Sequence, residues 1–163
     1  MRAGSGNAAV LGTVATLTES TTFTGLGDLP HFNPDDDRDP LHPAVASLRA
    51  AIAAATSVLI CTPEYAGGLP GSFKNLLDWT VGGGEIYGKP VAWINASSVA
   101  APTGGGDAHD SLRKVLTYAG AKIVEEACAR IPVPRAAVAD GVVTDPDLRE
   151  RIAVAVQRLS EGG

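Results

Sequence analysis

Short, mainly apolar runs alternate along this chain with stretches in which apolar residues recur every three or four positions. The runs predict buried strands, because a parallel strand covered on both faces needs apolar side chains throughout. They are Thr56–Thr62, Val91–Ala96 and Ala121–Glu126, the last reaching as far as Ala129, with a weaker β-branched and aromatic run at Thr21–Leu26. The periodic stretches predict helices over Asn7–Leu17, Ala44–Ala55, Ser72–Val81, from Asp107 or Asp110 to Ala119, and over Pro146–Leu159.

The order of these elements predicts an α/β fold. Helices that alternate with strands are typical of a doubly wound parallel sheet with helices on both faces. Right-handed crossovers then place the loops that follow the strands at one edge of the sheet, where ligands of such folds bind. With 163 residues, the chain predicts a single domain. Because it opens with a loop and a helix, we expect the sheet to lack its first, central strand.

Composition and charge narrow the possible functions. Hydrophobic residues make up 45% of the chain and charged residues 19%, as in globular proteins. A net charge of −5 without a basic cluster argues against nucleic acid and against a membrane surface as partners. No apolar run has the length of a spanning helix and no signal peptide is recognisable, so we expect a cytoplasmic protein.

Cysteine and histidine usage predicts neither a disulfide nor a metal site. Cys61 and Cys128 each fall in or near a predicted strand, as reduced core thiols do. The three histidines lack metal-ligand spacing, and the acidic run Asp35–Asp37 is more typical of a solvated loop than of a cation site.

Two loops at the expected ligand edge carry small and hydroxyl-bearing residues. In the first, residues 1–7, small side chains and a helix N-terminus suit an anion, and Arg2 can fork onto a phosphate; an ordinary N-terminus capped by Ser5 or Asn7 is the alternative. In the other, Asn95–Ser98 with Gly104–Gly106, hydroxyls and flexible amides suit the edge of a ring or a carbonyl; a plain surface loop is the alternative.

The loop after the run Thr56–Thr62 is the most distinctive of the three. Pro63 and Pro70 restrict its backbone, so the amides of residues 64–67 can face a planar polar ligand, with Tyr65 offering an aromatic face. Glu64 could be a general acid or base, or a carboxylate that fixes a loop or a subunit contact. The chain has no nucleophile elbow, no Walker A sequence and no G-x-G-x-x-G after a strand, which points to chemistry supplied by a cofactor.

Several blocks of this sequence resemble the NADPH-dependent FMN reductase family. They are Thr62-Pro63-Glu64-Tyr65, Pro70-Gly71-Ser72-Phe73-Lys74-Asn75, Asp78-Trp79, Gly88-Lys89-Pro90-Val91, Leu112–Leu116 and Gly120-Ala121. The resemblance implies a flavodoxin-like fold, FMN as cofactor, NAD(P)H as co-substrate and flavin, quinone, azo or metal-oxyanion acceptors. It also implies a homodimer or homotetramer and no catalytic side chain, since the flavin carries the hydride.

The resemblance assigns residues to parts of the flavin site. Arg2, Ser5 and Asn7 match the family's phosphate loop; Pro63, Glu64, Tyr65, Ala66 and Gly67 would border the isoalloxazine ring; Ser97 and Ser98 would close its other side. Ala66 stands where the family usually has Asn. In the family a strand and a Gly-Ser pair precede the phosphate loop, so we expect Met1 to be an internal methionine of a longer, here N-terminally truncated, protein. A flavin-binding electron carrier that uses no nicotinamide, and a non-catalytic truncated member, are the alternative functions.

Overall fold

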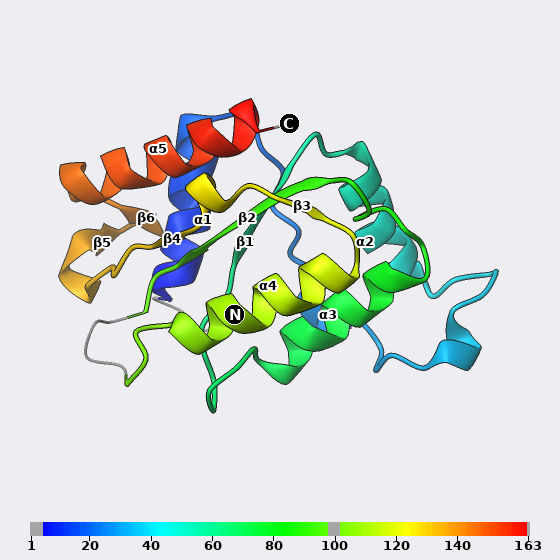
Figure 1. The fold of residues 1–163 in the computed structure, drawn as a ribbon. Helices are drawn as coiled ribbons and strands as arrows, with labels where there is room; N and C mark the ends of the chain where they lie inside the picture. The colour runs from blue at the N-terminus through cyan, green and yellow to red at the C-terminus, as the bar shows by residue number, and fades with distance from the viewer. Residues whose placement is uncertain (1–4, 98–101, 163) are drawn as a thin grey trace.

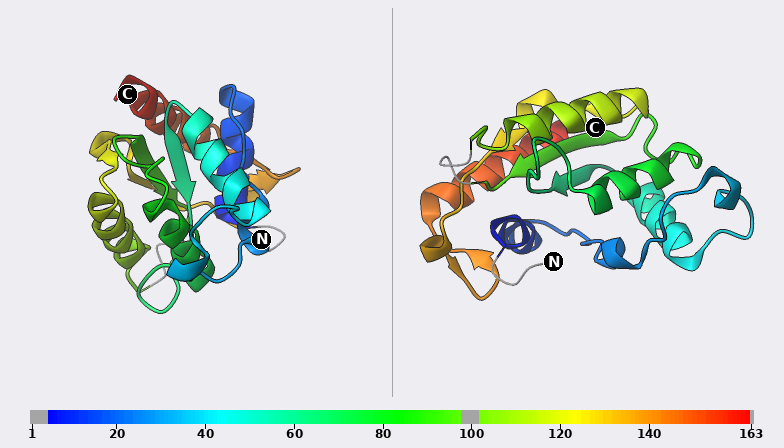
Figure 2. Two further views of the ribbon diagram at one scale, coloured as in Figure 1. Left: turned by 90° about the vertical axis from the view of Figure 1, so that its right-hand side faces the viewer. Right: turned by 90° about the horizontal axis from the view of Figure 1, so that it is seen from below.

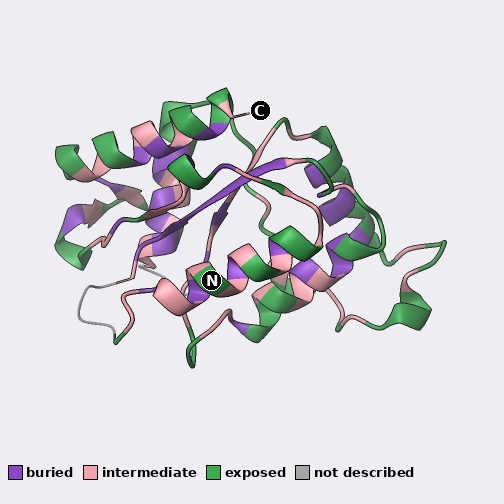
Figure 3. Ribbon diagram, in the orientation of Figure 1, coloured by how far each residue is buried: buried purple, intermediate pink, exposed green. Residues whose placement is uncertain are grey.

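The computed structural model describes residues 5–97 and 102–162, and a parallel sheet lies at its centre (Figure 1). Strand β2 (Pro90–Asn95) pairs on one side with β1 (Val58–Cys61) and on the other with β3 (Lys122–Ile123) and β4 (Ala129–Arg130). Val58 lies opposite Val91 and Cys61 opposite Ile94. Each residue of β2 is buried, as the central strand of a covered parallel sheet requires (Figure 3).

Helices cover both faces of the sheet. On one face, α2 (Pro43–Ala54), α3 (Gly71–Val81) and α4 (Gly106–Tyr118) pack against Val91 and Trp93; on the other, α1 (Gly6–Leu17) and α5 (Pro146–Glu161) pack against Ile94. In the side view of Figure 2, α1 and α4 lie on opposite sides of the strands. Alternate residues of β2 thus serve two separate cores, and the predicted α/β architecture is confirmed.

Most element positions agree with the sequence pattern, and the predicted strand at Thr21–Leu26 is wrong. Residues 18–24 have no regular secondary structure, and Gly25–Asp28 forms a 3₁₀ turn. A β-branched run becomes a strand only beside a partner. Among the described residues, no strand pairs with this segment or with the outer edge of β1.

The expected third strand is interrupted. Lys122–Ile123 and Ala129–Arg130 both pair with β2, but Glu125–Ala127 between them forms a 3₁₀ turn. The turn buries Ala127 beneath α5 and lets Glu125 meet Arg113 of α4. In a continuous strand, the two carboxylates of Glu125 and Glu126 would lie in a covered part of the sheet. Because burying unpaired charges is costly, the strand is interrupted at these residues.

A hairpin that the sequence analysis missed follows the sheet. Strands β5 (Val138–Ala139) and β6 (Val142–Val143) pair antiparallel around Asp140 and Gly141, whose φ angles are +49° and +77°. Asp-Gly between apolar residues is a strong signal for such a two-residue turn. A Cβ on Gly12 of α1 would lie 2.4 Å from the Gly141 carbonyl oxygen, so the hairpin explains a glycine in mid-helix.

The described helices include none that is both long and apolar enough to cross a membrane. Helix α4 begins at Gly106, just before the predicted start at Asp107 or Asp110, and its N-cap is Gly105, which offers no side chain. Ser5 caps α1 as predicted, with its hydroxyl oxygen accepting from the Ala8 amide.

Candidate functional site

The loop after β1 folds into a tight hairpin at the carboxyl edge of the sheet. Tyr65 and Gly68 exchange both backbone hydrogen bonds, at 2.9 and 3.1 Å, around Ala66 and Gly67. Both central residues have positive φ, +50° and +71°, which defines a two-residue turn of the primed type. The Tyr65 side chain is 64% exposed. The exposed tip of the hairpin is therefore formed by the Tyr65 ring and by Ala66 and Gly67, while the Tyr65 amide is bonded within the hairpin.

The Glu64 side chain reaches from the base of this hairpin to the start of α4. One carboxylate oxygen accepts a hydrogen bond from the Thr103 hydroxyl, and the other accepts from the Ala108 amide at 3.2 Å. The Thr103 hydrogen bond, together with the amides of Ala108 and Asp107, lowers the pKa of Glu64. Of the alternatives for Glu64, these contacts favour the carboxylate that fixes a loop over a general acid or base.

Asn95, the last residue of β2, joins the roots of the two flanking loops. Its side-chain amide donates to the Thr62 carbonyl oxygen at 3.0 Å, and its Oδ1 accepts from the Ser97 amide at 2.7 Å. The residue is only 2% exposed, so these partners are needed to offset its burial. The sequence placed Asn95 in a candidate ligand loop but gave it no role of its own, although a polar residue at the end of a buried strand is a signal for one.

The first turn of α1 lies against the same edge. Asn7 Oδ1 accepts from the Ala96 amide at 3.0 Å, and a Cβ on Gly6 would lie 3.2 Å from that of Ala96. The structure thus brings Ser5 and Asn7 beside the loop that contains Ser97. Arg2 and Ser98, also predicted site residues, lie outside the described residues.

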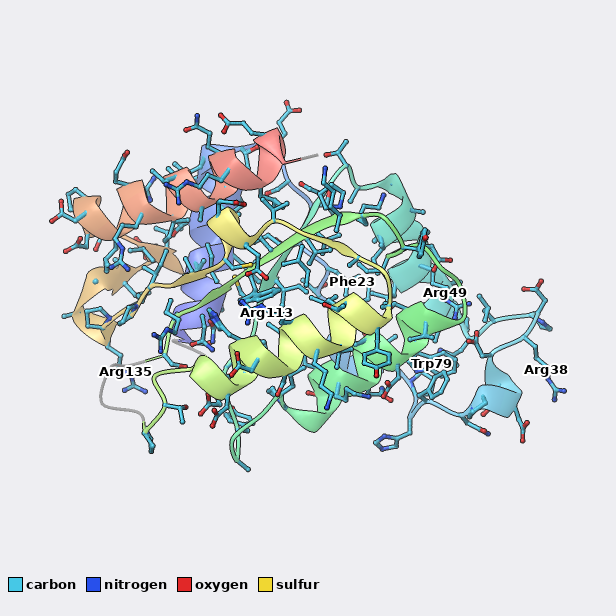
Figure 4. All side chains as sticks on the ribbon, viewed as in Figure 1. Phe23, Arg38, Arg49, Trp79, Arg113 and Arg135 are labelled. Carbon is cyan, nitrogen blue, oxygen red and sulfur yellow. The ribbon has the colours of Figure 1, made fainter. Side chains whose placement is uncertain are left out.

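Buried Trp93 meets half-buried His109 and the more exposed Arg113 behind the site, between β2 and α4. The rings of Trp93 and His109 meet edge to face at 5.7 Å. The guanidinium of Arg113, which is labelled in Figure 4, lies 5.5 Å from the centre of the Trp93 ring. Burial, and then the charges of Arg130 and Arg113, lower the pKa of His109 to about 4. The imidazole is therefore neutral at neutral pH, and His109 Nε2 and Trp93 Nε1 have no hydrogen-bond partner among the described residues.

The two cysteines and the acidic run contribute to the structure of the protein rather than to its chemistry. Burial raises the pKa of Cys61 to about 12 and of Cys128 to about 11, so neither is a ready nucleophile. Asp37 of the acidic run pairs with Arg49 at 2.7 Å, and Arg49 in turn donates to the Trp79 carbonyl oxygen. In residues 5–97 and 102–162, no group of three or more His, Cys, Asp or Glu side chains could hold a metal ion.

The sequence matches a known protein family. A family described as NADPH-dependent FMN reductase matches residues 1–132. The chain belongs to this family. The family and the flavodoxin-like α/β fold expected from the sequence are therefore confirmed, and at the level of the family so are FMN as cofactor and NAD(P)H as co-substrate.

Individual relatives of the FMN reductase family give finer comparisons. A 2-hydroxy-1,4-benzoquinone reductase of Burkholderia sp. is 40% identical over 103 residues, which span 61% of this chain and 54% of that protein. A quinone reductase of Escherichia coli K12 is 31% identical over 133 residues, covering 77% of this chain and 70% of its own. The structure of FerB, a flavoenzyme NAD(P)H:(acceptor) oxidoreductase from Paracoccus denitrificans, matches with a TM-score of 0.78 at 28% identity and covers 100% of this chain and 94% of its own.

The described residues fit FMN. The cofactor has an anionic phosphate end and a planar ring with polar edges. The N-terminus of α1, with Ser5, provides amides and a hydroxyl. The Tyr65–Gly68 hairpin provides an aromatic face, and the loop after Asn95 provides the Ser97 hydroxyl. All three lie at the carboxyl edge of one parallel sheet, where the fold class binds its ligands.

Proposed function

We propose that this chain is an FMN-dependent NAD(P)H oxidoreductase that reduces quinones. The proposal is carried by one observation: the α1 N-terminus, the loop with the Tyr65–Gly68 hairpin and the loop after β2 meet at one edge of the sheet. The chain that has this arrangement is a member of the FMN reductase family. The quinone acceptor is inferred from the printed activities of the Burkholderia and Escherichia coli relatives.

In this proposal each part of the edge has a task. Arg2, Ser5, Asn7 and the first amides of α1 hold the phosphate, although the Asn7 side-chain oxygen is already bonded to Ala96 and so contributes mainly by fixing the turn. Pro63, Tyr65, Ala66 and Gly67 border one side of the ring, and Ser97 and Ser98 border the other. When bound, FMN would accept hydride from the nicotinamide and pass electrons to the acceptor.

In this proposal the residues of the chain bind and orient FMN, and they do not transfer protons. Glu64 is hydrogen-bonded to Thr103 and Ala108, and His109 is neutral and half-buried behind the site, so we assign neither as an acid or base. The proposed site thus needs no catalytic side chain.

The test is a coupled binding and turnover measurement. Purified chain is titrated into FMN while flavin fluorescence is followed, and NADPH oxidation is then measured with FMN and a benzoquinone, each omitted in turn. We expect saturable FMN binding and NADPH oxidation that requires both additions. Binding without NADPH oxidation would identify the electron carrier instead, and absence of both would overturn the proposal. Azo-dye and chromate acceptors in the same assay test the wider acceptor range.

We also propose that the chain self-associates. Val81, Tyr87 and Tyr118, near the carboxyl ends of α3 and α4, are 61%, 77% and 89% exposed, which is unusual for large apolar side chains. Tyr87 and the end of α4 are neighbours, since a Cβ on Gly120 would lie 2.4 Å from the Tyr87 ring. Light scattering after gel filtration should show a dimer or tetramer that Tyr87→Ser with Tyr118→Ser weakens; a monomeric parent protein would exclude this part.

A further inference from the structure

We propose that Glu64 and Thr103 form a brace between the two loops that would border the flavin ring, and that Glu64 is a positioning residue. The inference rests on the proposed function, because it assigns a role within the same site. It concerns residues that lie 39 positions apart in the chain and come from opposite sides of the expected ring.

The contacts of Glu64 span the two loops. Its backbone directly precedes the Tyr65–Gly68 hairpin, while both of its carboxylate oxygens are bonded to the segment around the start of α4, through Thr103 Oγ1 and the Ala108 amide. Hydrogen bonds to an ionised carboxylate are stronger than those between neutral groups. The carboxylate is therefore suited to hold one loop against the other.

Thr103 is itself firmly anchored. While its hydroxyl donates to Glu64, its carbonyl oxygen accepts from the Gly106 amide at 3.0 Å and from the Arg130 guanidinium at 3.2 Å. Arg130 ends strand β4, so Thr103 ties Glu64 to the sheet edge as well as to α4. A contact to a fixed partner restrains the hairpin, whereas a contact to a mobile loop would not.

Helix α4 needs a cap from outside its own sequence, and Glu64 supplies it. The N-cap position is Gly105, with φ +88°, and a Cβ there would lie 2.7 Å from the Asn95 carboxamide. The usual capping residues Ser, Thr, Asp and Asn are thus excluded from this position, leaving the first amides of α4 without a local acceptor. The Glu64 carboxylate fills that role, with its negative charge at the positive end of the helix dipole.

The hairpin also rests on the first turns of α4. A Cβ on Gly67 would lie 3.5 Å from the Asp107 carboxylate, and one on Gly68 would lie 3.7 Å from the Ser111 hydroxyl. Because the hairpin lies this close to α4, the brace sets the position of the Tyr65–Gly68 hairpin before any flavin binds. Preorganisation of this kind raises affinity, because less conformational freedom is lost on binding.

Matched variants separate the brace from general stability. Thr103→Val removes the hydroxyl and keeps the shape, and Thr103→Ser keeps the hydroxyl. Glu64→Gln keeps the length but replaces one acceptor oxygen with a donor. Asp145→Ala removes the cap of α5, where Asp145 accepts from the Leu148 amide at 3.0 Å, and is the control for loss of a helix cap elsewhere.

In FMN titrations we expect Thr103→Val and Glu64→Gln each to raise the Kd about tenfold, the value of one hydrogen bond to a charged group. Thr103→Ser and Asp145→Ala should bind like the parent protein. The double variant Glu64→Gln/Thr103→Val should be little worse than either single variant, because both break the same brace. Parent-like binding by Thr103→Val, or fully additive losses, would overturn the inference.

Hydrogen exchange in flavin-free protein provides a readout that does not depend on the cofactor. Thr103→Val should accelerate exchange of amides in both 64–68 and 102–108, whereas Asp145→Ala should not. Unchanged exchange in Thr103→Val would also overturn the brace. If the parent protein binds no FMN while exchange responds as expected, the proposed function fails and the brace stands as a contact of the fold alone.

Discussion

Ala66 and Asp140 occupy the same position in two turns of the same backbone shape. Their φ angles are +50° and +49°, and each precedes a glycine, Gly67 at +71° and Gly141 at +77°. Asp tolerates the left-handed region because its short polar side chain can bond locally, whereas Ala does not. The turn at the proposed flavin rim is thus the more strained of the two.

Relieving this strain should stabilise the protein. We expect Ala66→Asn and Ala66→Gly to raise the free energy of unfolding by about 1 kcal/mol, and Asp140→Ala to lower it by about 1 kcal/mol. Urea unfolding of flavin-free protein measures all three. Equal stability of the parent and Ala66→Gly would show that the backbone relaxes at Ala66.

Two helical glycines should respond to alanine in opposite directions. Gly12→Ala would place a Cβ 2.4 Å from the Gly141 carbonyl oxygen, while no atom of the described residues lies within 4 Å of such a Cβ on Gly71, at the start of α3. Alanine is favoured over glycine in a helix by about 1 kcal/mol, so Gly71→Ala should stabilise or be neutral. Gly12→Ala should instead destabilise by about 1–3 kcal/mol, because the hairpin must shift. A stabilising Gly12→Ala would contradict the packing of β5 and β6 on α1.

Asn95 should not tolerate conversion to an acid. In Asn95→Asp, a carboxylate oxygen would face the Thr62 carbonyl oxygen, which now accepts from the side-chain amide. We expect a loss of about 2–3 kcal/mol in unfolding free energy, the cost of unsatisfied buried polar groups. The exposed Asn33→Asp is the matched control and should change stability by less than about 0.5 kcal/mol. Comparable losses in both variants would refute a special role for Asn95.

His109 should make stability depend on pH in the mildly acidic range. Its folded pKa is about 4, below the ordinary value of 6.5, so between these values the unfolded chain binds more protons than the folded one. The contribution to stability is present above pH 6.5 and is lost as the pH falls towards 4. The slope of unfolding free energy against pH in this window should be smaller in His109→Gln, measured by urea unfolding at a series of pH values. An unchanged slope would mean that His109 is accessible to protons in the fold.

Glu64 should also make stability depend on pH, but in a more acidic range than His109. Its folded pKa lies below the ordinary value of 4.5, so its stabilising effect is present above 4.5 and is lost as the pH falls through the lower, folded value. Since the Thr103 hydroxyl is the largest cause, Thr103→Val should reduce the acid-induced loss below pH 4.5. NMR titration of the Glu64 carboxyl would follow the pKa itself; a value that Thr103→Val leaves unchanged would exclude the hydroxyl as its cause.

Local patterns predicted the sheet and its helices because burial on two faces leaves a continuous apolar run, as in β2. They failed where the outcome depends on a distant partner. Thr21–Leu26 has strand-forming residues, but no strand lies beside it in the described part of the chain. At the N-cap position Gly105, Asn95 leaves no room for a side chain. Sequence also placed the three loops at one edge, but the links through Asn95 and Thr103 arise from contacts made across the fold.

The Val143 amide of β6 donates a hydrogen bond of 2.8 Å to Thr13 Oγ1 of α1, so the carboxyl-terminal part of the chain is bonded to the first helix. The family match ends at residue 132, yet Val143, Ile152 and Ala155 beyond it complete the core on which α1 rests. Helix α1 carries Ser5 and Asn7, so the last thirty or so residues support the opposite end of the chain. A protein that ends at residue 132 would therefore lack the apolar core that supports α1 and, with it, the proposed phosphate loop.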